Sequence, residues 1–250
     1  MIELKTAREL EKMKKACQIS AEAIKVAQSA LQVGVSTAYV DDKVREYIVS
    51  QGARPTFLGY GGFPKSACIS VNEELIHGIP SKNRIIKDGD IVSVDVGAFI
   101  DGYTGDNAAT FAIGNVSEEA QRLMAVTKES LLRAVEVCVP GNRIGDIGYA
   151  VQSYVEENGY SIVRDYVGHG VGKKLHEDPE VPNFGKPGHG ARLVPGMTIA
   201  IEPMVNLGRP EVEVLANDWT VVTKDRQLSA HFEYSVAITD KGPVVLTQWG

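Results

Sequence analysis

The chain has few cysteines, no excess of positive charge and no long apolar run. Its three cysteines, Cys17, Cys68 and Cys138, form no CxxC pair. A disulfide framework or a cysteine zinc site is therefore not expected, and a reducing cytoplasm is the default setting. The formal net charge is −6 and the pI about 5.5, which argues against nucleic acid as a partner. No apolar segment is long enough to span a membrane.

The N-terminal residues lack the features of a targeting signal. Met1 to Lys15 alternates charged and apolar residues, unlike a secretory signal with its continuous apolar segment. Lys5 to Lys15 is locally basic, and we interpret it as the polar face of a helix.

Several catalytic motifs are also missing. The sequence contains no GxSxG, so a serine hydrolase elbow is excluded. The run Gly168 to Lys174 has three alternating glycines but lacks the Walker spacing and the Ser or Thr after lysine. His176-Glu177 is followed by no second histidine at HExxH spacing. Cys68 has no base beside it in the sequence and is interpreted as a small buried thiol.

What the chain does have is enough apolar content, 44% of 250 residues, for one large domain or two fused halves. The periodicity predicts two helices followed by strands, and then the same order again. The expected helices are 6–31, 36–52, 117–139 and 143–158, and the expected strands are near 68–71, over 91–111 and between 161 and 245.

An internal repeat agrees with this order. The pattern Val44-x-x-Tyr47-Ile48-x-x-x-Gly52 returns at an offset of 107 as Val151-x-x-Tyr154-Val155-x-x-x-Gly159. The same offset relates Asp95 to Glu202, each an acid inside an apolar run. We therefore predict a single domain, 1–250, with two related halves of about 1–112 and 113–250. Chance reuse of glycine at helix ends and turns is the alternative explanation of such matches.

Two aspartates interrupt an otherwise apolar hairpin. Ile91 to Ile100 predicts a buried strand, and Asp101-Gly102 predicts a tight two-residue turn into a partner strand. In that register, Asp95 and Asp106 are diagonal neighbours on one face, with Cβ atoms roughly 7–8 Å apart or less. Two buried carboxylates repel, so a cation between them is the natural expectation.

The second half of the chain supplies matching side chains. Glu202 is enclosed by apolar residues, and strict alternation over 230–236 places His231 and Glu233 on the same face. His169 stands among glycines, which we expect to let the backbone approach a ligand closely. Four carboxylates and one neutral imidazole sum to −4, the charge that two divalent cations neutralise. Oxygen-rich ligation with one nitrogen suits Mn, Fe or Co, and two such ions can promote amide hydrolysis. Taken singly, each residue is more simply an ordinary turn or core residue.

These residues together resemble a known family. Asp95, Asp106, Gly-His169-Gly, Ile-Glu202-Pro-Met and Glu233 are similar to the five metal ligands of the methionine aminopeptidases, over nearly the whole chain. The segments 64–66, 77–80 and 217–225 resemble the type I branch, without the helical insertion of type II or an N-terminal zinc-binding extension.

The resemblance implies a fold, a reaction and roles for further residues. The fold would be α+β and of the pita-bread type, with two pseudo-symmetric halves of paired helices and antiparallel sheet around a central metal site. The reaction would be removal of an N-terminal methionine before a small second residue. His77 and His176 would be catalytic and contact the substrate, and Glu202 would both bind metal and transfer a proton. The methionine side chain would be bound by Phe57, Tyr60, Phe63, Cys68, Leu175 and Trp219.

Two positions depart from the family pattern: Tyr234 follows Glu233 where many members have His, and Leu175 precedes His176 where many have Phe. Neither is a ligand, so they affect the shape of the pocket rather than the reaction. An Xaa-Pro aminopeptidase or prolidase of the same fold is one alternative, although those carry an added N-terminal domain. A binding module that has lost its metal is another.

The same resemblance implies cofactors, partners and a location. The cofactors would be two divalent ions, Co, Mn or Fe, with Zn and Ni as further candidates. The partner would be the N-terminus of a peptide or nascent chain, acted on by a cytoplasmic monomer without nucleic acid or membrane. Transient contact with the ribosome is compatible with such an enzyme, and the basic stretch Lys5 to Lys15 gives it no support.

Overall fold

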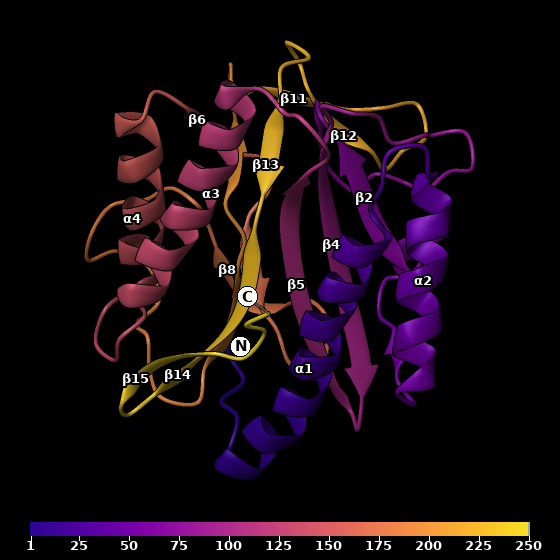
Figure 1. The fold of residues 1–250 in the computed structure, drawn as a ribbon. Helices are drawn as coiled ribbons and strands as arrows, with labels where there is room; N and C mark the ends of the chain where they lie inside the picture. Colours follow the sequence, from indigo (N-terminus) through magenta and orange to yellow (C-terminus); the bar gives the residue numbers. More distant parts are fainter. Residues whose placement is uncertain (250) are drawn as a thin grey trace.

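The structure is a computed structural model that describes residues 1–249, with helices packed on one side of an antiparallel sheet (Figure 1). Within these residues the helices are α1 (Ala7–Ala30), α2 (Thr37–Ser50), α3 (Glu118–Glu136), α4 (Ile144–Glu157) and the 3-10 turn η1 (Tyr60–Gly62). The strands of the first half are β1 (Arg54–Pro55), β2 (Ala67–Val71), β3 (Glu74–Ile76), β4 (Ile91–Ile100) and β5 (Tyr103–Ala112). The second half contains β6 (Ser161–Ile162), β7 (Gly168–Gly170), β8 (Glu177–Val181), β9 (Thr198–Ile201), β10 (Met204–Asn206), β11 (Val212–Val214), β12 (Val221–Thr223), β13 (Ser229–His231), β14 (Glu233–Thr239) and β15 (Gly242–Val245).

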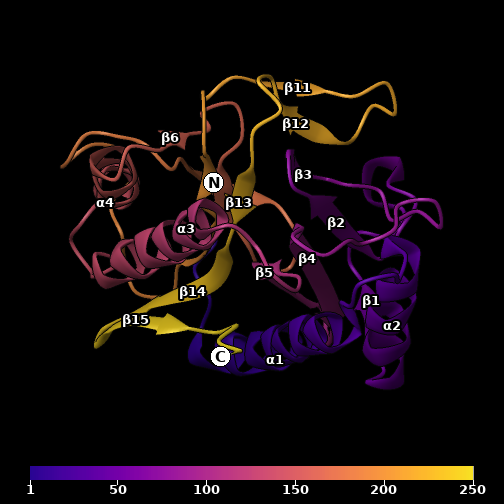
Figure 2. The same ribbon diagram turned by 45° about the horizontal axis from the view of Figure 1, so that its top comes forward.

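One large sheet joins the two parts of the chain. Its strand order is β1-β4-β5-β14-β9-β7-β8, with β2 beside β4 and β15 beside β14. Two three-stranded sheets, β13-β10-β6 and β11-β12-β3, accompany it. In Figure 2 the helices α1 and α3 lie along one side, and the β11–β12 hairpin lies at the opposite edge near β3. The predicted order of helices and strands is confirmed in both parts.

Helix starts follow the capping residues in the sequence. Thr6 caps α1 in a capping box with Glu9, and the Ser36 and Ser117 side chains accept from backbone N–H groups of α2 and α3. Gly52 and Gly159, which are related by the offset of 107, follow α2 and α4 with φ of 71° and 85°. Glycine adopts this left-handed conformation without the steric cost of a side chain.

The β4–β5 hairpin has the register expected from its turn. Asp101 and Gly102 both have positive φ, and Asp95 pairs with Ala108 while Asp106 pairs with Gly97. Along β4 the valines at 92, 94 and 96 belong to the main apolar core with α1 and α2. Asp95 therefore lies on the other face of the sheet, away from these helices. Gly105 lets α1 approach β5, since a Cβ there would lie 2.5 Å from the Cys17 backbone.

Two expectations are corrected by the structure. Lys5 precedes α1 and is buried, because its ammonium pairs with Glu177, so it does not belong to an exposed polar face. Residues 230–236 do not form one strand, because the chain breaks at Phe232 and β13 and β14 enter different sheets. The predicted alternation of faces nevertheless places both His231 and Glu233 near Glu202.

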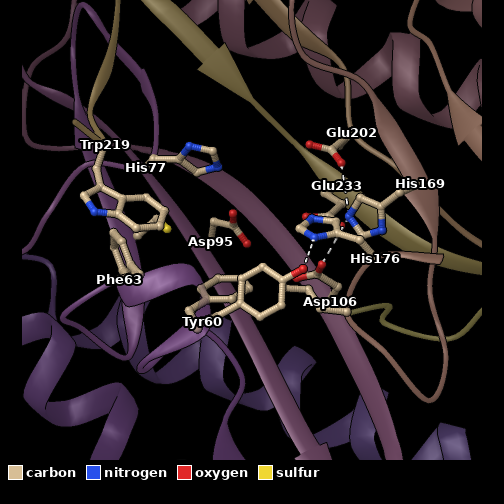
Figure 3. Close-up of a pocket in the computed structure, with 13 residues that line it drawn as sticks. Tyr60, Phe63, His77, Asp95, Asp106, His169, His176, Glu202, Trp219 and Glu233 are labelled. Carbon is tan, nitrogen blue, oxygen red and sulfur yellow. Dashed lines mark hydrogen bonds and ion pairs between the residues drawn. The ribbon is translucent and has the colours of Figure 1, made fainter. Parts of the chain in front are cut away.

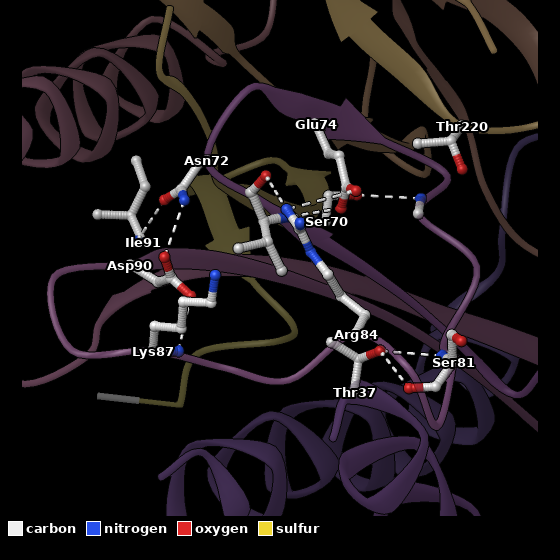
Figure 4. A network of polar contacts seen from close by, with 12 residues as sticks. Thr37, Ser70, Asn72, Glu74, Ser81, Arg84, Lys87, Asp90, Ile91 and Thr220 are labelled. Atoms are coloured by element: carbon white, nitrogen blue, oxygen red, sulfur yellow. Dashed lines mark hydrogen bonds and ion pairs between the residues drawn. The ribbon is translucent and has the colours of Figure 1, made fainter. Parts of the chain in front are cut away.

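A polar network holds the segment between β3 and β4 (Figure 4). Arg84 Nη2 donates to the Val71 carbonyl at 3.3 Å and lies 3.6 Å from Glu74 Oε1. The Ser81 N–H donates to Thr37 Oγ1 at 2.9 Å, and Asn72 Nδ2 donates to Asp90 Oδ1 at 2.9 Å. These contacts fix both ends of the loop that carries His77.

None of the helices within residues 1–249 combines the length and apolar character needed to cross a bilayer. The three cysteines are buried and unpaired with one another.

Candidate metal centre

All thirteen residues named from the sequence line one cavity of about 130 Å³ (Figure 3). The cavity lies on the face of the large sheet opposite α1 and α2. It is lined by Phe57, Tyr60, Phe63, Cys68, His77, Asp95, Asp106, His169, Leu175, His176, Glu202, Trp219 and Glu233. Asp106, Glu202, Glu233 and His169 gather at one end, Phe63 and Trp219 lie at the other, and Asp95 lies between them.

The five candidate ligands come from five neighbouring strands. Asp95, Asp106, Glu233, Glu202 and His169 lie on or directly after β4, β5, β14, β9 and β7, which is also their order across the sheet. Ala108 pairs with Asp95 on one side and with Glu233 on the other. This small residue leaves room between the two acids. Regular strand pairing thus brings together carboxylates that are far apart in the sequence.

His169 lies between carboxylates of both halves. Its Nε2 is 3.6 Å from Asp106 Oδ2 and 3.5 Å from Glu202 Oε1. Nδ1 is 2.9 Å from the Gly170 carbonyl, so it donates there and leaves the Nε2 lone pair free to bind a metal ion. One potential ligand atom each from Asp106, His169 and Glu233 lie within 4.8 Å of one another.

The glycines beside His169 let neighbouring backbone approach β7 closely. A Cβ at Gly168 would lie 2.4 Å from the Ala200 carbonyl, and one at Gly170 would lie 2.2 Å from the Asp178 carbonyl. They therefore allow β7 to pack closely against neighbouring backbone. The close packing holds His169 at its place in the sheet.

Three of the four carboxylates have an oxygen without a hydrogen-bond partner in the described part of the chain. Asp95 Oδ1, Asp106 Oδ1 and Glu233 Oε1 are buried and make no hydrogen bond to any residue in 1–249. Burial raises the pKa of Asp106 to about 7. Burial and the neighbouring Asp106 raise the pKa values of Asp95, Glu202 and Glu233 well above their usual range. Divalent cations would satisfy both the unpaired oxygens and the accumulated charge, so the residues present fit such ions.

The imidazoles of the site are neutral. Burial, and a smaller contribution from His176, lowers the pKa of His169 to about 3. Burial also lowers the pKa of His77 to about 4 and that of His176. A neutral imidazole can bind a metal or exchange a hydrogen bond, whereas a charged one would repel a cation.

The other end of the cavity is apolar. Phe57, Phe63, Cys68 and Leu175 form one buried cluster, with Ile79 and Trp219 packed against it. The Phe63 and Trp219 rings meet edge to face at 5.1 Å. Burial and the nearby acids raise the pKa of Cys68 well above its usual value, so it is a neutral wall residue, as expected.

Two histidines line the space between these ends. The Tyr60 hydroxyl is 2.7 Å from His176 Nδ1, and the His176 ring stands edge-on to His169 at 4.2 Å. His77 has a φ of 56°, a strained conformation for a residue with a side chain. The backbone that follows His77 is held by a hydrogen bond, because the Gly78 N–H donates to Ser70 Oγ at 3.0 Å. The Tyr60 hydroxyl thus holds the His176 ring, and the Gly78 hydrogen bond holds the backbone beside His77.

Comparison with known proteins agrees with this geometry. Residues 11–240 match metallopeptidase family M24. The chain belongs to metallopeptidase family M24. It is similar to the methionine aminopeptidase of Clostridium acetobutylicum, with 55% identity over 247 residues that cover 99% of both chains. It is also similar to the crystal structure of methionine aminopeptidase from Thermotoga maritima, with a TM-score of 0.98, 46% identity and coverage of 99% of this chain and 100% of that one.

Prolidases of family M24 are more distant. The prolidase from Pyrococcus furiosus has a TM-score of 0.79 and 28% identity, and the match covers 98% of this chain but 65% of that one. The pita-bread fold is therefore confirmed. Among these M24 proteins, sequence and structure place the chain beside the methionine aminopeptidases.

Three residues beside the cavity were given no role at the site from the sequence. His231 is buried with Nε2 3.7 Å from Glu202 Oε2. Asn183 donates from Nδ2 to the Glu202 carbonyl at 2.9 Å, and Ile79 packs on the apolar cluster. The alternation that put His231 on the face of Glu233 could have revealed the first. The contacts of Asn183 and Ile79 are long-range and leave no local pattern.

Proposed function

We propose that this chain hydrolyses the peptide bond after an N-terminal methionine when the second residue is small. The observation that carries the proposal is the cavity itself, in which a buried acidic cluster adjoins an apolar pocket of limited size. The apolar cluster around Phe63 and Trp219 suits an unbranched, polarisable thioether side chain. The relatives at high identity that bear the name methionine aminopeptidase support the same substrate.

In this proposal, Asp95, Asp106, His169, Glu202 and Glu233 would hold two divalent ions. When bound, the ions would polarise the scissile carbonyl and lower the pKa of the attacking water. The chemistry of the donors favours Mn, Fe or Co, with Zn and Ni as alternatives.

The chain's own residues would position the substrate and move protons. If the Tyr60 hydroxyl donates to His176 Nδ1, the ring proton sits on Nε2, which can then donate to the substrate carbonyl oxygen. His77 would contact the nitrogen side of the bond. Glu202 would take the proton of the attacking water and deliver it to the leaving amine. Phe57, Tyr60, Cys68 and Leu175 would complete the methionine pocket.

The proposed setting is the cytoplasm, where new chains carry their first methionine. The enzyme would act there as a monomeric single domain, with the two halves meeting at about residue 112, and any contact with the ribosome would be transient.

Peptide cleavage tests the proposal. Metal-stripped protein is supplied with Mn or Co and given Met-Ala-Ser, Met-Leu-Ser and Ala-Pro peptides. The proposal predicts metal-dependent release of methionine from Met-Ala-Ser, with little from Met-Leu-Ser. Cleavage of Ala-Pro alone would move the chain to the Xaa-Pro activity of its distant relatives. A protein that cleaves none of these peptides with either metal would contradict peptidase activity.

A further inference from the structure

His231 is a buried histidine behind the cavity wall rather than on it. It ends β13, is 1% exposed and does not line the cavity. Its Nε2 has no hydrogen-bond partner among the residues described. A buried polar atom without a partner is uncommon and calls for an explanation.

A candidate metal ligand lies beside this nitrogen. His231 Nε2 is 3.7 Å from Glu202 Oε2, while His169 Nε2 is 3.5 Å from Glu202 Oε1. The Glu202 carboxylate therefore lies between two imidazoles, one on the metal side and one behind it. Asn183 holds the backbone carbonyl of the same residue at 2.9 Å.

Hydrogen bonds of the His231 backbone fix the position of this residue. Its N–H donates to Thr110 Oγ1 at 2.9 Å, and its carbonyl accepts from the same hydroxyl at 2.8 Å. Its strand partner is Met204, two residues after Glu202. The backbone of His231 is thus held against β5 and paired with the strand that follows Glu202.

We propose that His231 is a positioning residue that donates its Nε2–H to Glu202 Oε2, so that Oε1 is held toward the metal side. The inference rests on the proposed function, in which Glu202 binds metal and transfers a proton. A carboxylate with one oxygen anchored presents the other in a defined direction, as outer hydrogen bonds commonly do at metal sites. The separation of 3.7 Å is longer than a hydrogen bond and shortens in the loaded site, since such contacts tighten in the working complex.

Matched variants test this role. His231→Leu removes the donor and keeps an apolar volume, His231→Gln restores an N–H of similar reach, and Phe232→Leu changes packing at the next residue. The readouts are kcat and KM on Met-Ala-Ser, Mn affinity by calorimetry and the absorption spectrum of the Co-loaded protein. We expect His231→Leu to lose about 10–100-fold in kcat or metal affinity and to change the Co spectrum. His231→Gln should recover most of the loss, and Phe232→Leu should resemble the wild type.

Two results would overturn the inference. One is His231→Leu with wild-type kcat, Mn affinity and Co spectrum. The other is a loss that glutamine does not rescue and that Phe232→Leu reproduces, since that pattern shows a packing effect.

A measurement on the unaltered chain covers the case in which the leucine variant does not fold. Nitrogen NMR of ¹⁵N-histidine-labelled protein, loaded with diamagnetic Zn, shows which ring nitrogen of each of the five histidines carries a proton. The His231 signal is identified by its absence in His231→Gln. Protonated Nε2 is expected, and an unprotonated Nε2 would overturn the proposal. This result is separate from activity: a wild type that binds Zn with protonated Nε2 but releases no methionine would contradict the proposed function alone.

Discussion

The two ends of the cavity are built on opposite principles. The acidic end collects Asp95, Asp106, Glu202 and Glu233 on or directly after paired strands, and three of these carboxylates have a buried oxygen without a hydrogen-bond partner among the residues described. The apolar end collects Phe57, Phe63, Cys68 and Leu175, largely from loops. These side chains are buried against one another in a single apolar cluster. The first arrangement costs folding stability unless a cation joins it, and the second contributes stability whether or not a ligand is bound. The acidic end is thus suited to metal binding and catalysis, and the apolar end is suited to recognising a substrate side chain.

We expect the largest loss of activity when one carboxylate charge is removed from the acidic end of the cavity. Asp106→Asn should lower kcat/KM by at least about 100-fold, because even outer partners of metal ligands are worth 10–100-fold. Asp101→Asn is the matched control, since Asp101 lies in the turn of the same hairpin and pairs with exposed Lys15. Steady-state assays with saturating Mn compare the two, with circular dichroism to check the fold. Equal activity in both variants would remove Asp106 from the site.

The second prediction concerns a buried carboxylate that, unlike those of the acidic end, already has a cationic side chain as its partner. Glu177, next to His176, pairs with Lys5 at 2.5 Å, and both side chains are at least 93% buried, with 3% and 7% exposure. Lys5→Met leaves Glu177 buried without its cation and should cost about 3–5 kcal/mol of unfolding free energy. Denaturant titration measures this, and Lys5→Met combined with Glu177→Gln should recover part of it. A single variant as stable as the wild type would show that Glu177 finds another partner or water.

A substitution at the apolar end should weaken the use of methionine peptides as substrates and leave the affinity for metal unchanged. Trp219→Leu removes the edge-to-face contact with Phe63 and should lower kcat/KM for methionine peptides by roughly 10–100-fold. Trp249→Leu is the control, because the second tryptophan packs on Phe111 instead. Calorimetry should show unchanged Mn affinity for both variants. A strong loss of Mn affinity in Trp219→Leu would mean that the two ends are not independent.

We expect the smallest effect in the pH dependence of the thermal stability of the protein after its metal has been removed by a chelator. The pKa of Asp106 is raised to about 7 in the folded chain, so its folded form holds a proton that the unfolded form releases, and stability falls as pH rises toward and through 7. The histidines, with pKa values lowered from 6.5 to about 3 or 4, act in the opposite direction below pH 6.5. Above pH 6.5 only the carboxylates remain. Thermal melts of chelated protein should therefore decline from pH 6.5 to about 8, less steeply in Asp106→Asn, and a flat or rising profile would contradict the raised pKa.

The two ends also differ in how far the sequence predicts them. The turn chemistry of Asp101-Gly102 and the period of a strand were enough to place Asp95 beside Asp106, because hairpin register is a local property. The positions of Glu202, Glu233 and His169 could be selected as buried polar residues, but their order across the sheet depends on pairing between distant strands. The pocket residues Phe57, Leu175 and Trp219 carry no local signal and came only from family resemblance. Lys5 with Glu177, and Asn183 with Glu202, were missed because each pair joins segments far apart in the chain.

Direct observation of metal tests the central claim, that the acidic end of the cavity is a site for two divalent ions. Crystals grown with Mn or Co and measured at the absorption edge of that metal would locate the ions by anomalous scattering. We expect two peaks contacting Asp95, Asp106, His169, Glu202 and Glu233, on the face of the sheet opposite α1 and α2. No peak in the cavity, or peaks held by other residues, would contradict it.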